Sequence, residues 1–201
     1  MLLKLAGATS ALAVAGCVGN SDSNDQSTTT PQAQADGLDA AKSLDTDRIA
    51  ADPRDIPDPV DCTEPRHHDI EITTTEETAE IEPGVTFDYM TFDGRIPGPM
   101  VRVRRGDTVN LTLTNQDGNA MPHNIDFHAV YGPGGGANDT TVSPGESATI
   151  EFKAMYPGVF VYHCAVPNMD QHISAGMFGA ILVEPEGGLP EVDRELYFGQ
   201  N

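Results

Sequence analysis

The residues best suited to chemistry fall in two short segments, 121–128 and 162–177. Together these segments hold four of the six histidines, one cysteine and two methionines that follow it closely. Two imidazoles, one thiolate and a weakly bound thioether are the ligands of a blue-copper electron-transfer site. We therefore predict a type 1 copper site made of His123, Cys164, His172 and Met177.

The alternation of side chains along a strand predicts a second metal site beside the first. Neighbouring residues of a strand point to opposite faces, and residues two apart share a face. His163 and Cys164 are adjacent, whereas Asp126 and His128 are two apart. We expect His123 and Cys164 to face inward. Asp126, His128 and His163 then face outward together, as half of a second site, and the peptide between His163 and Cys164 joins the two sites.

The elements that must position these residues have the pattern of short strands. Residues 108–114 and 148–152 alternate polar and apolar side chains, and residues 159–162 and 179–183 are apolar runs rich in β-formers. Turns rich in glycine and proline separate them, at 97–99, 132–136, 143–145 and 156–158. The sequence therefore predicts an all-β protein, an antiparallel sandwich or barrel.

The N-terminal third differs from the rest of the chain. Residues 1–17 read as a signal peptide, with Lys4, an apolar stretch and a lipobox that ends at Cys17. Residues 18–60 are polar and acidic, and no aromatic residue precedes Phe87, so we expect a disordered linker there. The folded domain is expected at 61–188, and residues 189–201 are expected to be a further linker. Lipidation of Cys17 places the protein outside the cell, anchored to the outer face of the cytoplasmic membrane or in an equivalent of the periplasm.

The charge of the chain argues against nucleic-acid binding. Asp and Glu number 31 against 11 Lys and Arg, which gives a formal net charge of −20. Such a surface repels phosphate backbones and anionic lipid headgroups. Because acidic residues also occur through the second half, we favour adaptation to high salt over an acidic tail on an ordinary protein.

The cysteines allow two interpretations. In an exported protein Cys62 and Cys164 could form a disulfide. Cys164 lies between histidines, however, and this favours a metal ligand. Cys62 lies near His67 and His68, and here we favour a surface position without function over a second metal site.

The motifs between residues 92 and 164 resemble those of a known family. Residues 65–200 resemble the N-terminal cupredoxin domain of copper-containing nitrite reductases, in a salt-adapted, haloarchaeal-like version. The motifs that carry the resemblance are Phe92-Asp93-Gly94, Pro97-Gly98-Pro99, Gly106-Asp107, Pro122-His123-x-x-Asp126-x-His128 and Tyr162-His163-Cys164. The resemblance implies a Greek-key cupredoxin barrel.

The resemblance also implies a role for each residue of both sites. His123, Cys164, His172 and Met177 match the type 1 copper ligands. His128 and His163 match two of the three type 2 copper ligands, and Asp126 matches the aspartate that hydrogen-bonds nitrite and relays protons. The implied partners are nitrite, a small redox protein as electron donor, and a homotrimer that includes a second cupredoxin domain.

Three hypotheses follow. Members of that family carry a second domain that supplies a third type 2 histidine, and in these 201 residues no histidine follows His172. The first hypothesis, which we favour, is a nitrite reductase whose second domain is missing from this chain. The second is a membrane-tethered blue-copper carrier without catalysis, which needs neither Asp126 nor His128. The third is a small multicopper oxidase, disfavoured because that class has a His-Cys-His run and Ala165 follows Cys164.

Overall fold

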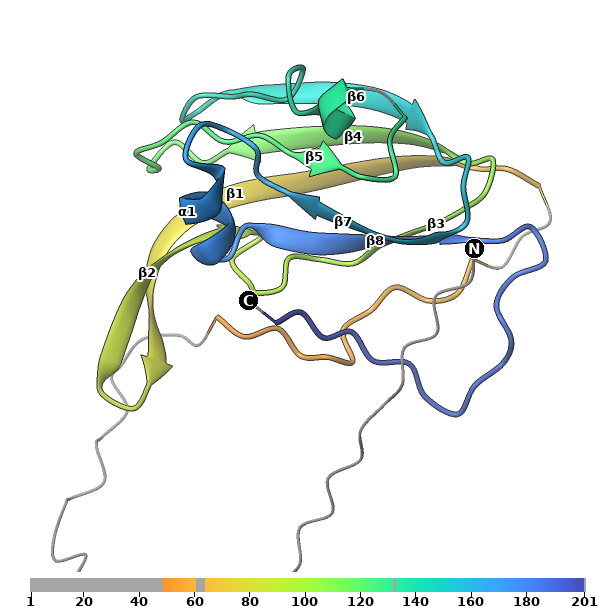
Figure 1. Ribbon diagram of the computed structural model, residues 1–201, viewed down its shortest axis with the longest axis horizontal. Helices are drawn as coiled ribbons and strands as arrows, with labels where there is room; N and C mark the ends of the chain where they lie inside the picture. Colours follow the sequence, from red (N-terminus) through yellow and green to blue (C-terminus); the bar gives the residue numbers. More distant parts are fainter. Residues whose placement is uncertain (1–48, 61–63, 132, 201) are drawn as a thin grey trace, which may run out of the picture. The chain divides into compact units, whose positions relative to one another are not determined.

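The described part of the chain is a sandwich of two four-stranded sheets (Figure 1). A computed structural model describes residues 49–60, 64–131 and 133–200. The first sheet has the strand order β2-β1-β4-β6 and the second β3-β8-β7-β5. The elements are β1 (His67–Glu82), β2 (Val85–Phe92), β3 (Val101–Arg104), β4 (Thr108–Asn115), β5 (Asp126–Phe127), the short 3-10 helix η1 (Pro133–Gly136), β6 (Ser147–Lys153), β7 (Gly158–His163), the helix α1 (Met169–Ser174) and β8 (Phe178–Glu184).

The strands predicted from the sequence are confirmed. They correspond to β4, β6, β7 and β8, and their ends agree to within one residue. In β4 every second residue is buried, which matches the alternation of threonine or asparagine with valine or leucine. The expected sandwich is confirmed, but it is not antiparallel throughout, because β1 runs parallel to β4 and β3 runs parallel to β8. Such parallel pairs join strands that are distant in sequence, so no local turn signal reveals them.

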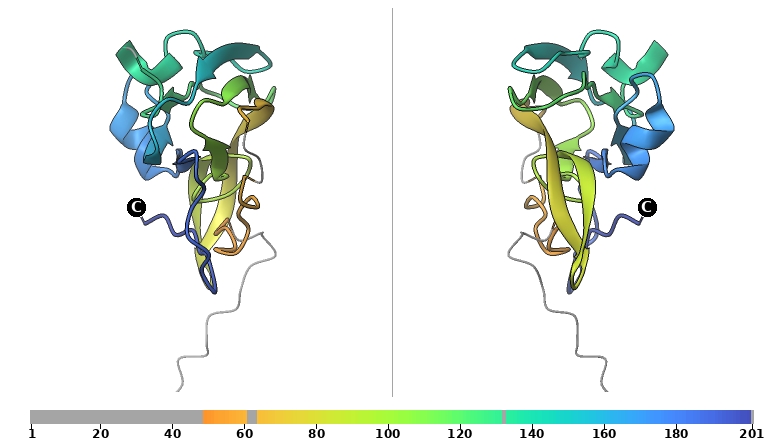
Figure 2. Two further views of the ribbon diagram at one scale, coloured as in Figure 1. Left: turned by 90° about the vertical axis from the view of Figure 1, so that its right-hand side faces the viewer. Right: turned by 90° about the vertical axis from the view of Figure 1, so that its left-hand side faces the viewer.

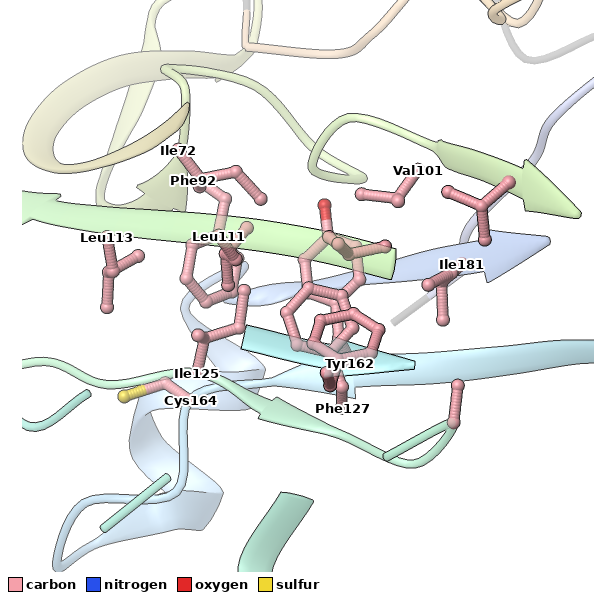
Figure 3. Close-up of a cluster of buried hydrophobic side chains, with 14 of the residues drawn as sticks. Ile72, Phe92, Val101, Leu111, Leu113, Ile125, Phe127, Tyr162, Cys164 and Ile181 are labelled. Atoms are coloured by element: carbon pink, nitrogen blue, oxygen red, sulfur yellow. The ribbon is translucent and has the colours of Figure 1, made fainter. Parts of the chain in front are cut away.

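The core lies between the sheets and is centred on aromatic side chains (Figure 3). Tyr162 is fully buried, and its ring centroid lies 5.0 Å from that of Phe127 and 5.3 Å from that of Phe92. Figure 3 shows Cys164 beyond Ile125, with its sulfur directed away from these rings. Cys164 therefore lies at one end of the apolar core.

The expected boundaries of the two linkers differ from the structure. Residues 49–60, which fall in the predicted 18–60 linker, lie against the sandwich: Ile49 is buried and the amide of Ala51 donates to the carbonyl of Ile96 at 2.8 Å. Residues 189–200 pack beside them, and the amide of Tyr197 donates to the carbonyl of Pro53 at 2.9 Å. Figure 2 shows the two segments on the same side of the domain. Ordering these segments costs conformational entropy, and their composition alone suggested that this cost would keep them disordered. Backbone hydrogen bonds to the sandwich help to offset it.

One buried arginine ties both segments to the second sheet. The guanidinium of Arg102 in β3 donates to Glu184 at 2.5 Å, to Glu195 at 2.8 Å and to the carbonyl of Pro57 at 2.9 Å. Its side chain is 1% exposed. Because a buried charge is costly unless it is paired and hydrogen-bonded, these contacts hold residues 57 and 195 in place.

Several expectations fall outside the described residues. These are the signal peptide 1–17, the lipobox with Cys17, residues 18–48 of the linker, and Cys62. Within the ranges that are described, no helix combines the length and the apolar character that crossing a bilayer requires.

Candidate metal centres

The predicted type 1 residues converge at the end of the core. The thiol of Cys164 lies 3.6 Å from Nδ1 of His172 and 4.0 Å from Nδ1 of His123. All three side chains are fully buried, and so is Met177. The structure therefore brings together residues from two segments that are about forty positions apart in the sequence.

Backbone pairing fixes the position of each of these residues. His123 exchanges two backbone hydrogen bonds with Val142, at 3.0 and 2.9 Å. Beyond the end of β7, the amide of Cys164 donates to the carbonyl of Met177 at 3.2 Å, and the amide of Met177 donates to the carbonyl of His172 at 3.0 Å. His172 lies on α1, which folds the chain back so that its Nδ1 lies 3.6 Å from the sulfur of Cys164.

Burial prepares the cluster for a metal ion. Desolvation lowers the pKa of His123 and of His172, and it raises the pKa of the Cys164 thiol. Desolvation acts in this way because it disfavours every charged form. Both imidazoles are therefore held in the neutral form that binds metals, whereas the thiol must release its proton when a metal binds.

The donor atoms of the cluster fit a single metal ion. With metal–nitrogen and metal–sulfur lengths of about 2.0 and 2.3 Å, as in zinc sites, two ligands at 120° around one ion lie roughly 3.7 Å apart. The distances of 3.6 and 4.0 Å between Cys164 Sγ and the two imidazole nitrogens agree with this. Two imidazoles with a thiolate in a dry pocket are the donor set of blue copper.

A second cluster lies on the opposite side of the Cys164 peptide. Asp126 and His163 are cross-strand partners in β5 and β7, and His128 follows β5 directly. Nε2 of His128 lies 3.1 Å from Nε2 of His163, and the three side chains place their ligand atoms within 4.8 Å of one another. His128 is exposed and the other two are half-buried. This is the division into two faces that the alternation predicted.

This cluster also has a geometry that suits a metal. Nδ1 of His163 lies 3.0 Å from the carbonyl oxygen of Cys164, so it carries the ring proton and donates it there. The lone pair of Nε2 then points toward His128. Two imidazole nitrogens bound at about 2.0 Å to one ion lie roughly 3.1–3.3 Å apart, which matches the observed 3.1 Å.

Two positioning residues escaped the sequence analysis. Asn124 is buried, and its Oδ1 accepts a hydrogen bond from the amide of Ala165 at 2.6 Å, which ties the two ligand segments together. Glu76 on β1 lies 3.0 Å from Nε2 of His123. The signal that could have revealed Glu76 is its phase in the strand, because it shares a face with the buried Ile72 and Thr74.

Gly135 packs directly over the Asp126 carboxylate. A Cβ at Gly135 would lie 2.1 Å from Oδ1 of Asp126 and 2.5 Å from the carbonyl oxygen of Phe127, and the residue has φ of +48°. The η1 turn can therefore approach Asp126 this closely only with glycine at this position.

We expect Gly135→Ala to displace Asp126 and to destabilise the fold by about 1–3 kcal/mol, the usual cost of overpacking. Gly134→Ala is the matched control, because Gly134 also has a positive φ (68°) but its Cβ would meet no atom closer than 3.9 Å. Thermal unfolding of both variants measures the difference. Equal melting temperatures would show that the turn gives way without strain.

Comparisons with known proteins agree with this geometry. The family profile described as multicopper oxidase matches residues 73–188, which include both clusters. The chain belongs to the multicopper oxidase family. One similar solved structure is a copper nitrite reductase from Nitrosomonas europaea, with a TM-score of 0.59 and 40% identity, and the match covers 64% of this chain and 46% of that chain. Another is a multicopper oxidase, with a TM-score of 0.61 and 35% identity, and the match covers 71% of this chain and 52% of that chain. These neighbours confirm the expected cupredoxin fold and, with the ligand set, the expectation of copper.

Among these two classes of similar structure, the curated relatives favour the copper-containing nitrite reductases. A copper-containing nitrite reductase from Neisseria meningitidis serogroup B is 46% identical over 154 residues, which are 77% of this chain and 40% of the relative. One from Alcaligenes xylosoxydans is 50% identical over 109 residues, 54% of this chain and 33% of the relative. The chain thus spans less than half the length of these curated relatives. The resemblance to copper-containing nitrite reductases noted from the motifs is confirmed.

Proposed function

We propose that this chain is the copper-binding front part of a nitrite reductase. In that reaction nitrite takes up one electron and two protons and yields nitric oxide and water. The observation that carries the proposal is the presence of two clusters on opposite sides of one peptide, between His163 and Cys164. A protein that only carries electrons needs the buried cluster alone.

Each cluster has a distinct task in this proposal. Copper, when bound, supplies one-electron redox chemistry at the buried cluster and Lewis acidity toward a nitrite oxygen at the half-exposed one. His123, Cys164, His172 and Met177 would hold the type 1 ion away from water. His128 and His163 would hold the type 2 ion where a small anion can enter.

Asp126 is the proton donor of the proposal. Its carboxyl group shares the face of His128 and His163, within 4.8 Å of their ligand nitrogens. A carboxyl at this distance can hydrogen-bond a bound nitrite and transfer a proton to the oxygen that leaves as water. Gly135 restricts the space beside this carboxyl, so its orientation is set by the fold.

The half-exposed cluster supports a larger assembly. Catalytic metal sites of this kind use three protein ligands, and His128 and His163 supply two imidazoles. We propose that a second cupredoxin domain within a homotrimer completes the site, in line with the greater length of the relatives. A small redox protein is the proposed electron donor.

The location and the charge of the protein are also part of the proposal. The N-terminal signal pattern and Cys17 support export and a lipid anchor on the outer face of the cytoplasmic membrane. The net charge of −20 supports a protein adapted to high salt.

Copper titration of the full chain tests the proposal. We expect one equivalent of copper to produce intense visible absorption, and a second equivalent to bind without such colour and to change its electron paramagnetic resonance signal when nitrite is added. Because His128 and His163 are only two of the three proposed ligands, the second equivalent is expected to bind more weakly than the first. Binding of a single, coloured equivalent even at excess copper would mean that the outer cluster holds no metal, and it would favour the tethered blue-copper carrier.

A further inference from the structure

Glu76 is the centre of a compact hydrogen-bond network behind the buried cluster. Its carboxylate accepts hydrogen bonds from the backbone amides of Ala120, at 3.1 Å, and Met121, at 2.9 Å. Its Oε1 also lies 3.0 Å from Nε2 of His123. The backbone amide of Glu76 donates in turn to Oδ1 of Asn119 at 2.8 Å. Both the backbone and the side chain of Glu76 are thus fixed to the segment that carries His123.

The geometry assigns the proton of His123. Nδ1 of this ring faces the thiol of Cys164, and a nitrogen that binds a metal must present its lone pair. The ring proton therefore resides on Nε2, which donates it to the Glu76 carboxylate. This contact selects the one tautomer that leaves Nδ1 free for a metal.

The second imidazole of the cluster has no such support. Nε2 of His172 is buried and has no hydrogen-bond partner among the described residues. His172 is held by its place on α1, whereas His123 is held by a carboxylate on a different strand. The two histidines are therefore not equivalent, because only His123 has a carboxylate, that of Glu76, behind its ring.

We propose that Glu76 is the positioning residue of the type 1 copper centre and that it lowers the reduction potential of the centre. A carboxylate that accepts the far N–H of a ligand histidine fixes the ring and makes its metal-binding nitrogen more basic. A more basic ligand and a nearby negative charge stabilise Cu(II) more than Cu(I). This inference rests on the proposed type 1 assignment of His123 and Cys164.

The chain supplies a matched control one position along the same strand. The carboxylate of Glu77 accepts hydrogen bonds from the hydroxyls of Thr75, at 2.9 Å, and Thr91, at 3.4 Å. No hydrogen bond links it to His123. Glu77→Gln removes the same charge from β1 without changing the contact behind the ligand. Glu76→Gln keeps the size and shape of the side chain, whereas Glu76→Ala removes it.

The experiment compares the full copper-loaded chain with Glu76→Gln, Glu76→Ala and Glu77→Gln. We expect both Glu76 variants to lose about 10–100-fold in Cu(II) affinity, the usual cost of removing such a partner. A tenfold loss of preference for Cu(II) over Cu(I) corresponds to a rise of about 59 mV in the potential. Spectroelectrochemical titration and the visible spectrum measure these effects, and Glu77→Gln is expected to match the unmodified chain.

Two outcomes would overturn the inference in different ways. If the unmodified chain gives intense visible absorption and both Glu76 variants keep its potential, spectrum and affinity, Glu76 is only a structural contact, even if the variants melt earlier. If the unmodified chain gives no such absorption, the type 1 assignment fails and the inference fails with it. Should Glu76→Ala not fold, the shape-conserving Glu76→Gln variant decides the result.

Discussion

Replacing Cys164 with alanine is expected to abolish the intense visible absorption of the copper-loaded chain. The thiolate is the soft ligand that distinguishes a blue-copper site from a site made of imidazoles alone. Its sulfur lies 3.6 Å from Nδ1 of His172 and 4.0 Å from Nδ1 of His123, and alanine offers no ligand atom in its place. The measurement is the absorption spectrum after addition of one equivalent of Cu(II).

Two controls make this result decisive. Circular dichroism of the metal-free variant shows whether the fold survives the loss of one small, buried side chain. Cys62→Ala removes the cysteine for which we expect no role, and it should leave the colour unchanged. Colour that persists in Cys164→Ala would refute the ligand assignment, and loss of colour in Cys62→Ala would make Cys62 a ligand.

The sequence predicted the strands that have a clear alternation or a dense apolar run. β4 has a regular alternation of polar and apolar residues, and β7 and β8 each contain a run of consecutive apolar residues. β1 was not predicted, although it spans sixteen residues. Its sequence is rich in threonine and glutamate, and it is stabilised by pairing with β2 on one side and β4 on the other, which no local pattern reports.

The division of the candidate site into two faces could be predicted because it depends on adjacency. His163 and Cys164 are neighbours at the end of β7, so opposite orientations follow from strand geometry alone. The same reasoning was weaker for His123, because β5 contains only Asp126 and Phe127. His123 faces inward because of its separate backbone pairing with Val142.

Contacts between distant parts of the chain were beyond the sequence analysis. Glu76 lies 47 residues before His123, and Gly135 reaches Asp126 only because η1 folds back onto β5. Such contacts depend on how strands are ordered in the two sheets. Motifs identify residues that bind the metal, whereas residues that orient these ligands become visible only in three dimensions.

Replacing His128 with alanine is expected to have the opposite result to Cys164→Ala. The visible absorption should remain, because His128 lies on the outer face and takes no part in the buried cluster. Copper content should fall by one equivalent per chain. The response of this second copper to nitrite should disappear with it, because His128 is one of the two imidazoles of the outer cluster.

His67→Ala is the matched control for this prediction, because His67 on β1 is also an exposed histidine. Its side chain is 52% exposed, and its Nε2 lies 3.5 Å from a carboxylate oxygen of Asp69. It should change neither colour nor copper content. Equal loss of colour in His128→Ala and Cys164→Ala would refute the two-face division, because it would mean that the ligands serve one shared ion. Retention of both copper equivalents in His128→Ala would instead show that the outer cluster does not hold a metal, and the enzyme proposal would then lose the observation that carries it.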